Sequence, residues 1–103
     1  MAFHFQRVSA QKAILHTGTI LIVGDPSFKE FEACLSKVVR QCTDLVIIDF
    51  SECIYIDSHA IRTIISMNRR LNASGGKLQI QNTNQKISGL LRAIQLDRII
   101  EMV

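Results

Sequence analysis

The chain has 103 residues, of which 48% are hydrophobic and 20% are charged, and its formal net charge is +3. This size and balance predict one globular domain over residues 1–103, and the apolar runs are far shorter than the roughly 20 residues of a membrane-spanning helix. Since the amino-terminal segment also lacks the pattern of a secretion signal, we expect a cytoplasmic protein without membrane insertion.

The first half of the chain predicts two strands, a helix and a core strand. The segments "AFHFQRVSA" (2–10) and "AILHTGTILIV" (13–23) flank a polar break and predict two strands, paired antiparallel. After "GDPSF" (24–28), apolar residues recur at helical spacing and predict an amphipathic helix over 27–41. The run "DLVIIDF" (44–50) is typical of a strand that is covered on both faces or lies at the sheet centre.

The second half alternates helices with strands. Apolar residues at helical spacing follow Ser58, and "NASGGK" (72–77) ends this helix with Gly75 or Gly76 in a left-handed turn. "KLQIQN" (77–82) alternates as a strand with one wet face, "KISGLLRAIQL" (86–96) predicts a helix, and "RIIEMV" (98–103) predicts a short closing strand. The order β-β-α-β-α-β-α-β predicts an α/β fold with a mixed, mostly parallel sheet and crossover helices.

Cysteine and charge patterns exclude several classes of protein. Cys34, Cys42 and Cys53 are an odd set without CxxC spacing, which favours reduced thiols over disulfides or a zinc site. The basic residues are spread along the chain, with only Arg69 and Arg70 adjacent. No basic stripe and no base-stacking motif is present, so we expect no direct nucleic-acid binding.

Two stretches imitate enzyme motifs. Asp57, Ser58 and His59 are the residue types of a hydrolase triad, but successive side chains point in different directions and cannot form the relay. Neither His4 nor His16 has a neighbouring motif that would make it a catalytic base. "SGGK" lacks the first glycine and the final Ser/Thr of a phosphate loop. We therefore expect no catalytic residue and no nucleotide cofactor.

A metal cluster of Asp49, Glu52 and Asp57 is also disfavoured, because Asp49 lies within an apolar strand and no paired His or Cys ligands are present.

Ser58 is the remaining candidate site residue, and it lies at the junction of a strand end and a helix start. Its ordinary role is as the helix N-cap, which contributes about 1 kcal/mol. The same position suits a phosphate, because the first turn of a helix carries free N–H groups and a positive dipole end.

Three blocks of the sequence resemble the STAS domain, and within it the bacterial anti-sigma-factor antagonists. "DLVIIDFSECIYIDS" (44–58) resembles the core strand and phosphorylation loop of the family, "RLNASGGKLQIQN" (70–82) the following helix end and strand, and "ISGLLRAIQLDRIIEM" (87–102) the closing block. The blocks occur in order and at the usual separations, so the resemblance spans nearly the whole chain.

The resemblance implies a non-enzymatic switch. It places phosphorylation at Ser58, with Asp57 shaping the loop, and implies a serine kinase/anti-sigma factor partner and a serine phosphatase. The unphosphorylated form would bind the partner, and the added charge would release it. Partner contacts would include Asp25, Asp57, Ser58, His59 and Arg62, although His59, Ala60 and Arg62 differ from the small residues of many antagonists and should alter partner choice. The alternative is a STAS subunit of a membrane-associated transport or signalling-scaffold complex without a phospho-switch.

Overall fold

The computed structural model describes residues 3–7, 12–17, 21–22, 27–41 and 44–102. A five-stranded sheet forms one layer, and its strand order is β1-β2-β4-β6-β7. β1 is antiparallel to β2, and every other neighbouring pair is parallel. The fold class is therefore α/β with a mixed, mostly parallel sheet, as predicted. The strands are β1 (Phe3–Arg7), β2 (Lys12–Thr17), β4 (Leu45–Asp49), β6 (Lys77–Gln81) and β7 (Glu101–Met102).

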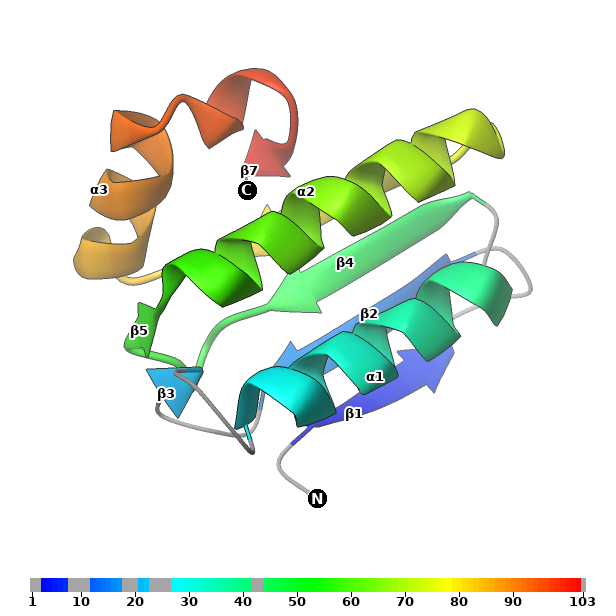
Figure 1. Ribbon diagram of the computed structural model, residues 1–103, viewed down its shortest axis with the longest axis horizontal. Coiled ribbons are helices and arrows are strands. Elements are labelled where there is room, and N and C mark those ends of the chain that lie inside the picture. The colour runs from blue at the N-terminus through cyan, green and yellow to red at the C-terminus, as the bar shows by residue number, and fades with distance from the viewer. Residues whose placement is uncertain (1–2, 8–11, 18–20, 23–26, 42–43, 103) are drawn as a thin grey trace.

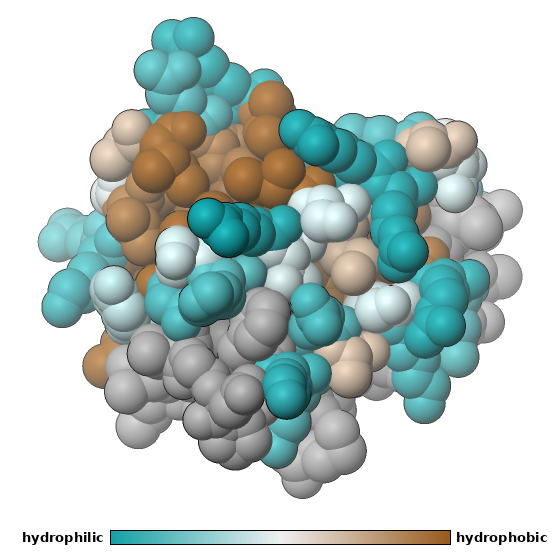
Figure 2. Space-filling model, in the orientation of Figure 1, coloured by the Kyte–Doolittle hydropathy of each residue, from teal (hydrophilic) through white to brown (hydrophobic). Residues whose placement is uncertain are grey.

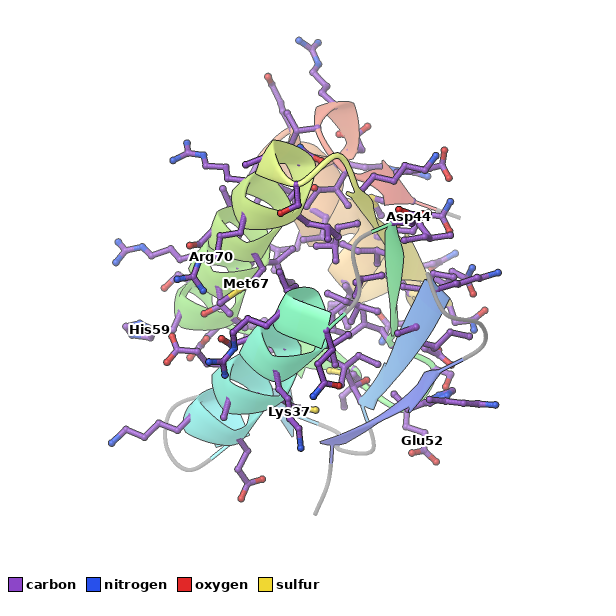
Figure 3. All side chains as sticks on the ribbon, turned by 90° about the vertical axis from the view of Figure 1, so that its right-hand side faces the viewer. Lys37, Asp44, Glu52, His59, Met67 and Arg70 are labelled. Carbon is purple, nitrogen blue, oxygen red and sulfur yellow. The ribbon has the colours of Figure 1, made fainter. Side chains whose placement is uncertain are left out.

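Two long helices, α1 (Ser27–Gln41) and α2 (Ser58–Ala73), lie side by side over one face of this sheet (Figures 1 and 3). α1 has the predicted bounds, and α2 ends at the predicted turn, where Gly75 adopts a φ of +89° that favours glycine. The third helix, α3 (Gln85–Ala93), is followed by the 3-10 helix η1 (Leu96–Arg98).

The central strand β4 supplies much of the core. Val46 and Ile48 are fully buried beneath the helices, and Ile47 points to the other face, between Ile14 and Gln79 of the flanking strands. Ile47 is nevertheless only 2% exposed. β4 therefore lies at the sheet centre, the second of the two placements that its composition allowed.

Two short strands differ from the prediction. The segment 13–23 was expected to be one strand, but β2 ends at Thr17, and β3 (Leu21–Ile22) pairs instead with β5 (Tyr55–Ile56) in a separate parallel sheet. The closing strand β7 begins at Glu101 and not at Arg98, because Gln95, with a φ of +64°, ends α3 and the chain then turns through η1.

Candidate functional site

The chain between β4 and α2 is held in place by buried side chains. Phe50, Cys53 and Ile56 are each at most 2% exposed. The backbone N–H of Phe50 donates to the Gln81 carbonyl of β6 at 3.0 Å, and that of Cys53 donates to the Phe50 carbonyl at 3.0 Å. Because every third residue from Phe50 to Ile56 is buried, this connection holds Ser58 in a defined position at the start of α2.

Asn84, the residue before α3, also holds the connection between β4 and α2 through hydrogen bonds. Its amide group donates long hydrogen bonds to the carbonyls of Cys53 (3.4 Å) and Ile54 (3.3 Å). Its side-chain oxygen accepts from the Ile87 N–H at 2.8 Å, which makes Asn84 the N-cap of α3. Sequence reasoning missed this residue, although an asparagine just before a helix is a recognisable cap signal. One side chain thus joins α3 to the segment that precedes Ser58.

The variant Asn84→Asp separates these two roles. Aspartate retains the acceptor that caps α3 but replaces the amide donor, so the carbonyls of Cys53 and Ile54 lose their partner. We expect amide hydrogen exchange at residues 54–56 to accelerate about three- to tenfold, with α3 unchanged, since one net hydrogen bond is lost. The uncharged capping variant Asn84→Ser is the control for charge. Equal acceleration in α3 and the loop would show that Asn84 acts only as a cap.

Asp57, not Ser58, is the N-cap of α2. Asp57 has extended backbone angles, and its carboxylate accepts the Ala60 N–H at 3.1 Å. Ser58 is the first helical residue, and its side chain is exposed. The expectation of a Ser58 cap is therefore wrong, because the residue that leaves the extended conformation is one position earlier. The hydroxyl of Ser58 is not needed for capping.

This assignment predicts a clear difference between neighbouring alanine variants. Asp57→Ala should lower the free energy of unfolding by about 1 kcal/mol, the usual cost of losing a cap. Ser58→Ala should change it by less than about 0.5 kcal/mol, as expected for an exposed surface site. Urea unfolding measures both, with Asp57→Asn as a control that keeps the capping oxygen. A larger loss for Ser58→Ala would contradict the assignment.

A surface hollow of about 320 Å³ borders the start of α2. Its lining side chains come from α1 and α2: Glu32, His59, Arg62, Thr63, Ser66 and Met67. The predicted contact residues His59 and Arg62 therefore line one hollow, and the view along the helices shows His59 and Met67 on the α2 side of it (Figure 3). Glu32 of α1 contributes an acidic side chain to this lining, and the sequence did not predict its place there. Asp25, the remaining predicted contact residue, lies outside the described residues.

A hydrophobic patch lies on the other side of α2. The apolar surface seen in Figure 2 spreads over α3 and the adjoining side of α2. Ile61 and Ile65 of α2 and Leu90 of α3 are partly exposed, and Ile94 is 46% exposed. In the segment before Ser58, Ile54 is 51% exposed. Contiguous exposed apolar surface is typical of protein-binding faces.

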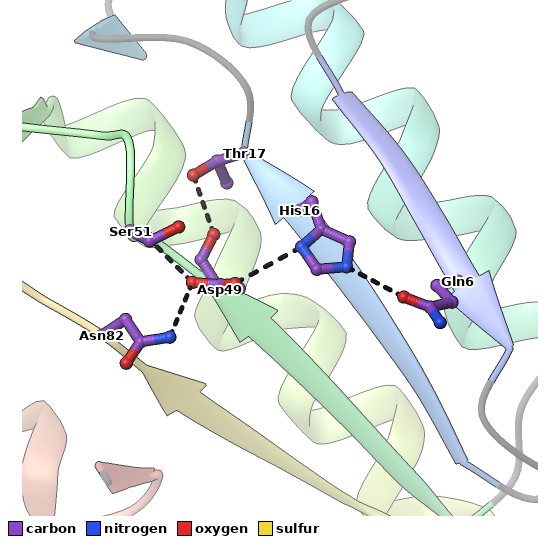
Figure 4. Close-up of polar contacts among 6 residues, drawn as sticks. All are labelled: Gln6, His16, Thr17, Asp49, Ser51 and Asn82. Atoms are coloured by element: carbon purple, nitrogen blue, oxygen red, sulfur yellow. Dashed lines mark hydrogen bonds and ion pairs between the residues drawn. The ribbon is translucent and has the colours of Figure 1, made fainter.

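A polar cluster joins the carboxyl ends of β2, β4 and β6 (Figure 4). The carboxylate of Asp49 lies 3.3 Å from the His16 ring and accepts hydrogen bonds from the Asn82 side chain (3.1 Å) and the Ser51 N–H (2.9 Å). His16 also lies 3.4 Å from the side-chain oxygen of Gln6. Asp49 does end the apolar strand β4, as predicted, and its polar neighbours come from β2, from the connection after β4 and from the residue after β6.

Asp49 should make stability depend on acid pH. Burial alone raises the pKa of Asp49, but the hydrogen bonds from Asn82 and Ser51 and the nearby His16 outweigh it and hold the pKa below 3.8. A carboxylate with a depressed folded pKa stabilises the fold above its unfolded pKa, and this contribution is lost as pH falls through the folded value. Asp49→Asn should therefore show a smaller stability loss than the wild type between about pH 5 and pH 2.

Denaturant unfolding at several pH values measures this difference, with the exposed Glu52→Gln as control. A wild-type-like acid profile for Asp49→Asn would refute the role of Asp49.

Other predicted features have simpler outcomes. Cys34 and Cys53 are free thiols, as predicted. Partial burial raises the pKa of Cys34, and the nearby positive charge of Lys37 lowers it by a smaller amount. Cys42 lies outside the described residues. Over the residues that the structure describes, no three His, Cys, Asp or Glu side chains converge as a metal site. None of the described helices combines the length and hydrophobicity needed to cross a bilayer.

Residues 16–103 match the family model described as "Mlab, STAS domain". This match covers most of the chain. The chain belongs to the STAS-domain family. A comparison with curated protein sequences gives no significant match.

Solved structures share the fold of this STAS domain. The anti-sigma factor antagonist SpoIIAA in its unphosphorylated form superposes with a TM-score of 0.82 at 15% identity, covering 99% of this chain and 88% of that one. Phosphorylated SpoIIAA from Bacillus gives 0.72 at 16% identity, with 99% and 91% covered. TM1081 from Thermotoga maritima, described as a candidate anti-sigma factor antagonist, gives 0.74 at 19% identity, with 97% and 84% covered. At these identities the likeness establishes the fold.

Proposed function

We propose that this STAS domain is a non-enzymatic, phosphorylation-controlled protein-binding switch that works in the cytoplasm as a single domain over residues 1–103. Unphosphorylated, it binds a serine kinase/anti-sigma partner. Phosphorylation of Ser58 releases that partner, and a serine phosphatase restores binding. The observation that carries the proposal is the placement of Ser58, which is exposed as the first residue of a helix whose cap is supplied by another side chain.

The surroundings of Ser58 support a partner surface centred on it. The hollow with His59 and Arg62 and the patch with Ile61 and Ile65 border the first turns of the same helix. A phosphate adds about −1.5 to −2 charges, which the helix start tolerates, so the fold survives while the surface changes. In this proposal Asp57, Ser58, His59, Arg62 and Asp25 contact the partner. The existence of SpoIIAA structures in both phosphorylation states supports the extension to this chain.

The second candidate is a STAS subunit of a membrane-associated transport or signalling-scaffold complex in which Ser58 serves only contact roles. The matching family model is described as "Mlab, STAS domain" and not as an anti-sigma factor antagonist, and this difference supports the second candidate. In such a complex, a partner subunit would cover the hydrophobic patch around Ile94 permanently.

Intact-mass analysis and peptide mapping of the protein isolated from its own cells distinguish the two candidates. The switch predicts a fraction of molecules that carries one phosphate, located on Ser58, and that varies with growth condition. A protein that remains unmodified at Ser58 under all conditions would refute the switch and leave the subunit role.

A further inference from the structure

The two long helices end at the same edge of the molecule, opposite Ser58. In a parallel sheet with crossover helices, the helices run back against the strands, so α1 and α2 both finish beside the start of β4. Arg70 lies twelve residues after Ser58 on α2, about 18 Å away at 1.5 Å per residue. Figure 3 is viewed from this edge and shows Arg70 between the two helices. This edge is therefore distant from Ser58, although the first hollow extends along α2 to Met67, one turn before Arg70.

A second surface hollow of about 320 Å³ lies between these helix ends, and its walls are Val39, Arg40, Arg70 and Ser74. This volume is at the lower end of the roughly 300–1,000 Å³ found for small-ligand sites. Arg40 comes from the last turn of α1 and Arg70 from the last turn of α2, and both side chains are exposed. The Ser74 hydroxyl donates to the Arg70 carbonyl at 3.4 Å, so the two guanidinium groups are the main donors toward the hollow.

A third arginine lies next to the two that line this hollow. Arg69 directly precedes Arg70 on α2 and is exposed. Lys12 and Lys77 flank Leu45 in the sheet and, like Ile47, lie on the face away from the helices. Asp44, whose carbonyl accepts the Lys77 N–H at 2.8 Å, is the acidic side chain described at this edge. Arg40 and Arg70 are far apart in sequence, and the packing of α1 against α2 brings them to one hollow.

Basic residues at a helix end also balance the helix dipole. That role requires a cation near each helix end, but it does not require two arginines from different helices to face one hollow. Planar guanidinium groups that line one hollow from two helices suit the oxygens of a phosphate group, which each of them can bind bidentately. The apolar wall at Val39 adds contact for the remainder of a small ligand.

We propose that this hollow, lined by Arg40 and Arg70, is a binding site for a phosphate group, carried either by a small phosphorylated molecule or by a phospholipid headgroup. The test uses the full chain and two probes. Inorganic phosphate is titrated at constant ionic strength and followed by amide NMR, and vesicles of phosphatidylglycerol are compared with vesicles of phosphatidylcholine by flotation. Saturable shifts confined to residues 39–41 and 70–76 are expected with phosphate.

The double variant Arg40→Gln/Arg70→Gln should weaken phosphate binding about tenfold or more, since it removes two charge-assisted donors. The double variant Arg92→Gln/Arg98→Gln removes the same charge from exposed positions of α3 and η1 and should bind like the wild type. Phosphate binding without flotation assigns the site to small molecules, and flotation with phosphatidylglycerol that the first variant abolishes assigns it to lipid headgroups. The absence of both, or equal losses in the two variants, would overturn the proposal.

Discussion

Replacement of Ser58 by aspartate is expected to reduce recovery of the partner from a native lysate about tenfold or more. The substitution places a negative charge at the centre of the proposed contact surface, between the hollow and the hydrophobic patch, and each 1.4 kcal/mol of repulsion or desolvation is about tenfold in affinity. The effect should come from the surface and not from unfolding, because Asp57 retains the cap and a carboxylate is favourable in the first helical turn.

The matched control is Ser58→Asn, which has the shape of aspartate without its charge. Asparagine and Ser58→Ala variants should recover near wild-type amounts of partner, measured by quantitative mass spectrometry after tagged pull-down. Equal recovery with Asp and Asn would show that charge at this position does not control binding, and would favour the subunit role.

Arg62 should moderate the proposed effect of charge at Ser58. It lies four residues after Ser58 on α2 and therefore on the same side of the helix, where its guanidinium can pair with a carboxylate or phosphate at Ser58. This position departs from the small residue of many antagonists. The geometry explains how such a departure can change partner choice without changing the fold.

Truncation of Phe50 is expected to produce the largest loss of stability. Phe50→Ala should lower the free energy of unfolding by about 3–5 kcal/mol, because the ring is fully buried and leaves a cavity under the helices. The melting temperature should fall by roughly 10 °C or more. Since Phe50 begins the connection to Ser58, the variant should also loosen residues 53–57.

Thermal and urea unfolding measure the global loss, and hydrogen exchange at residues 53–57 measures the local one. Phe50→Leu keeps most of the apolar volume and should cost only about 1 kcal/mol. A small loss for Phe50→Ala would mean that the neighbouring core refills the space and that Phe50 does not anchor the segment.

Helices and strands whose patterns depend on near neighbours could be predicted from the sequence. The 3.6-residue spacing of apolar residues located α1 and most of α2, and the period of two located β6, because each pattern records which side of one element faces the core. The same local reasoning placed Ser58 at a strand-to-helix junction. It misassigned the cap by one residue, because Asp and Ser both cap well and only the backbone angles at Asp57 distinguish them.

Contacts between residues far apart in the sequence could not be predicted in this way, because they depend on how the elements assemble. Asp49, His16 and Asn82 lie at the carboxyl ends of three neighbouring strands, and their cluster depends on strand order and register, which no single segment encodes. Arg40 and Arg70 lie on different helices, and they share a hollow because parallel strands with crossover connections bring both helix ends to one edge. Local periodicity determines what each segment becomes, whereas sites built across segments follow from how the sheet assembles them.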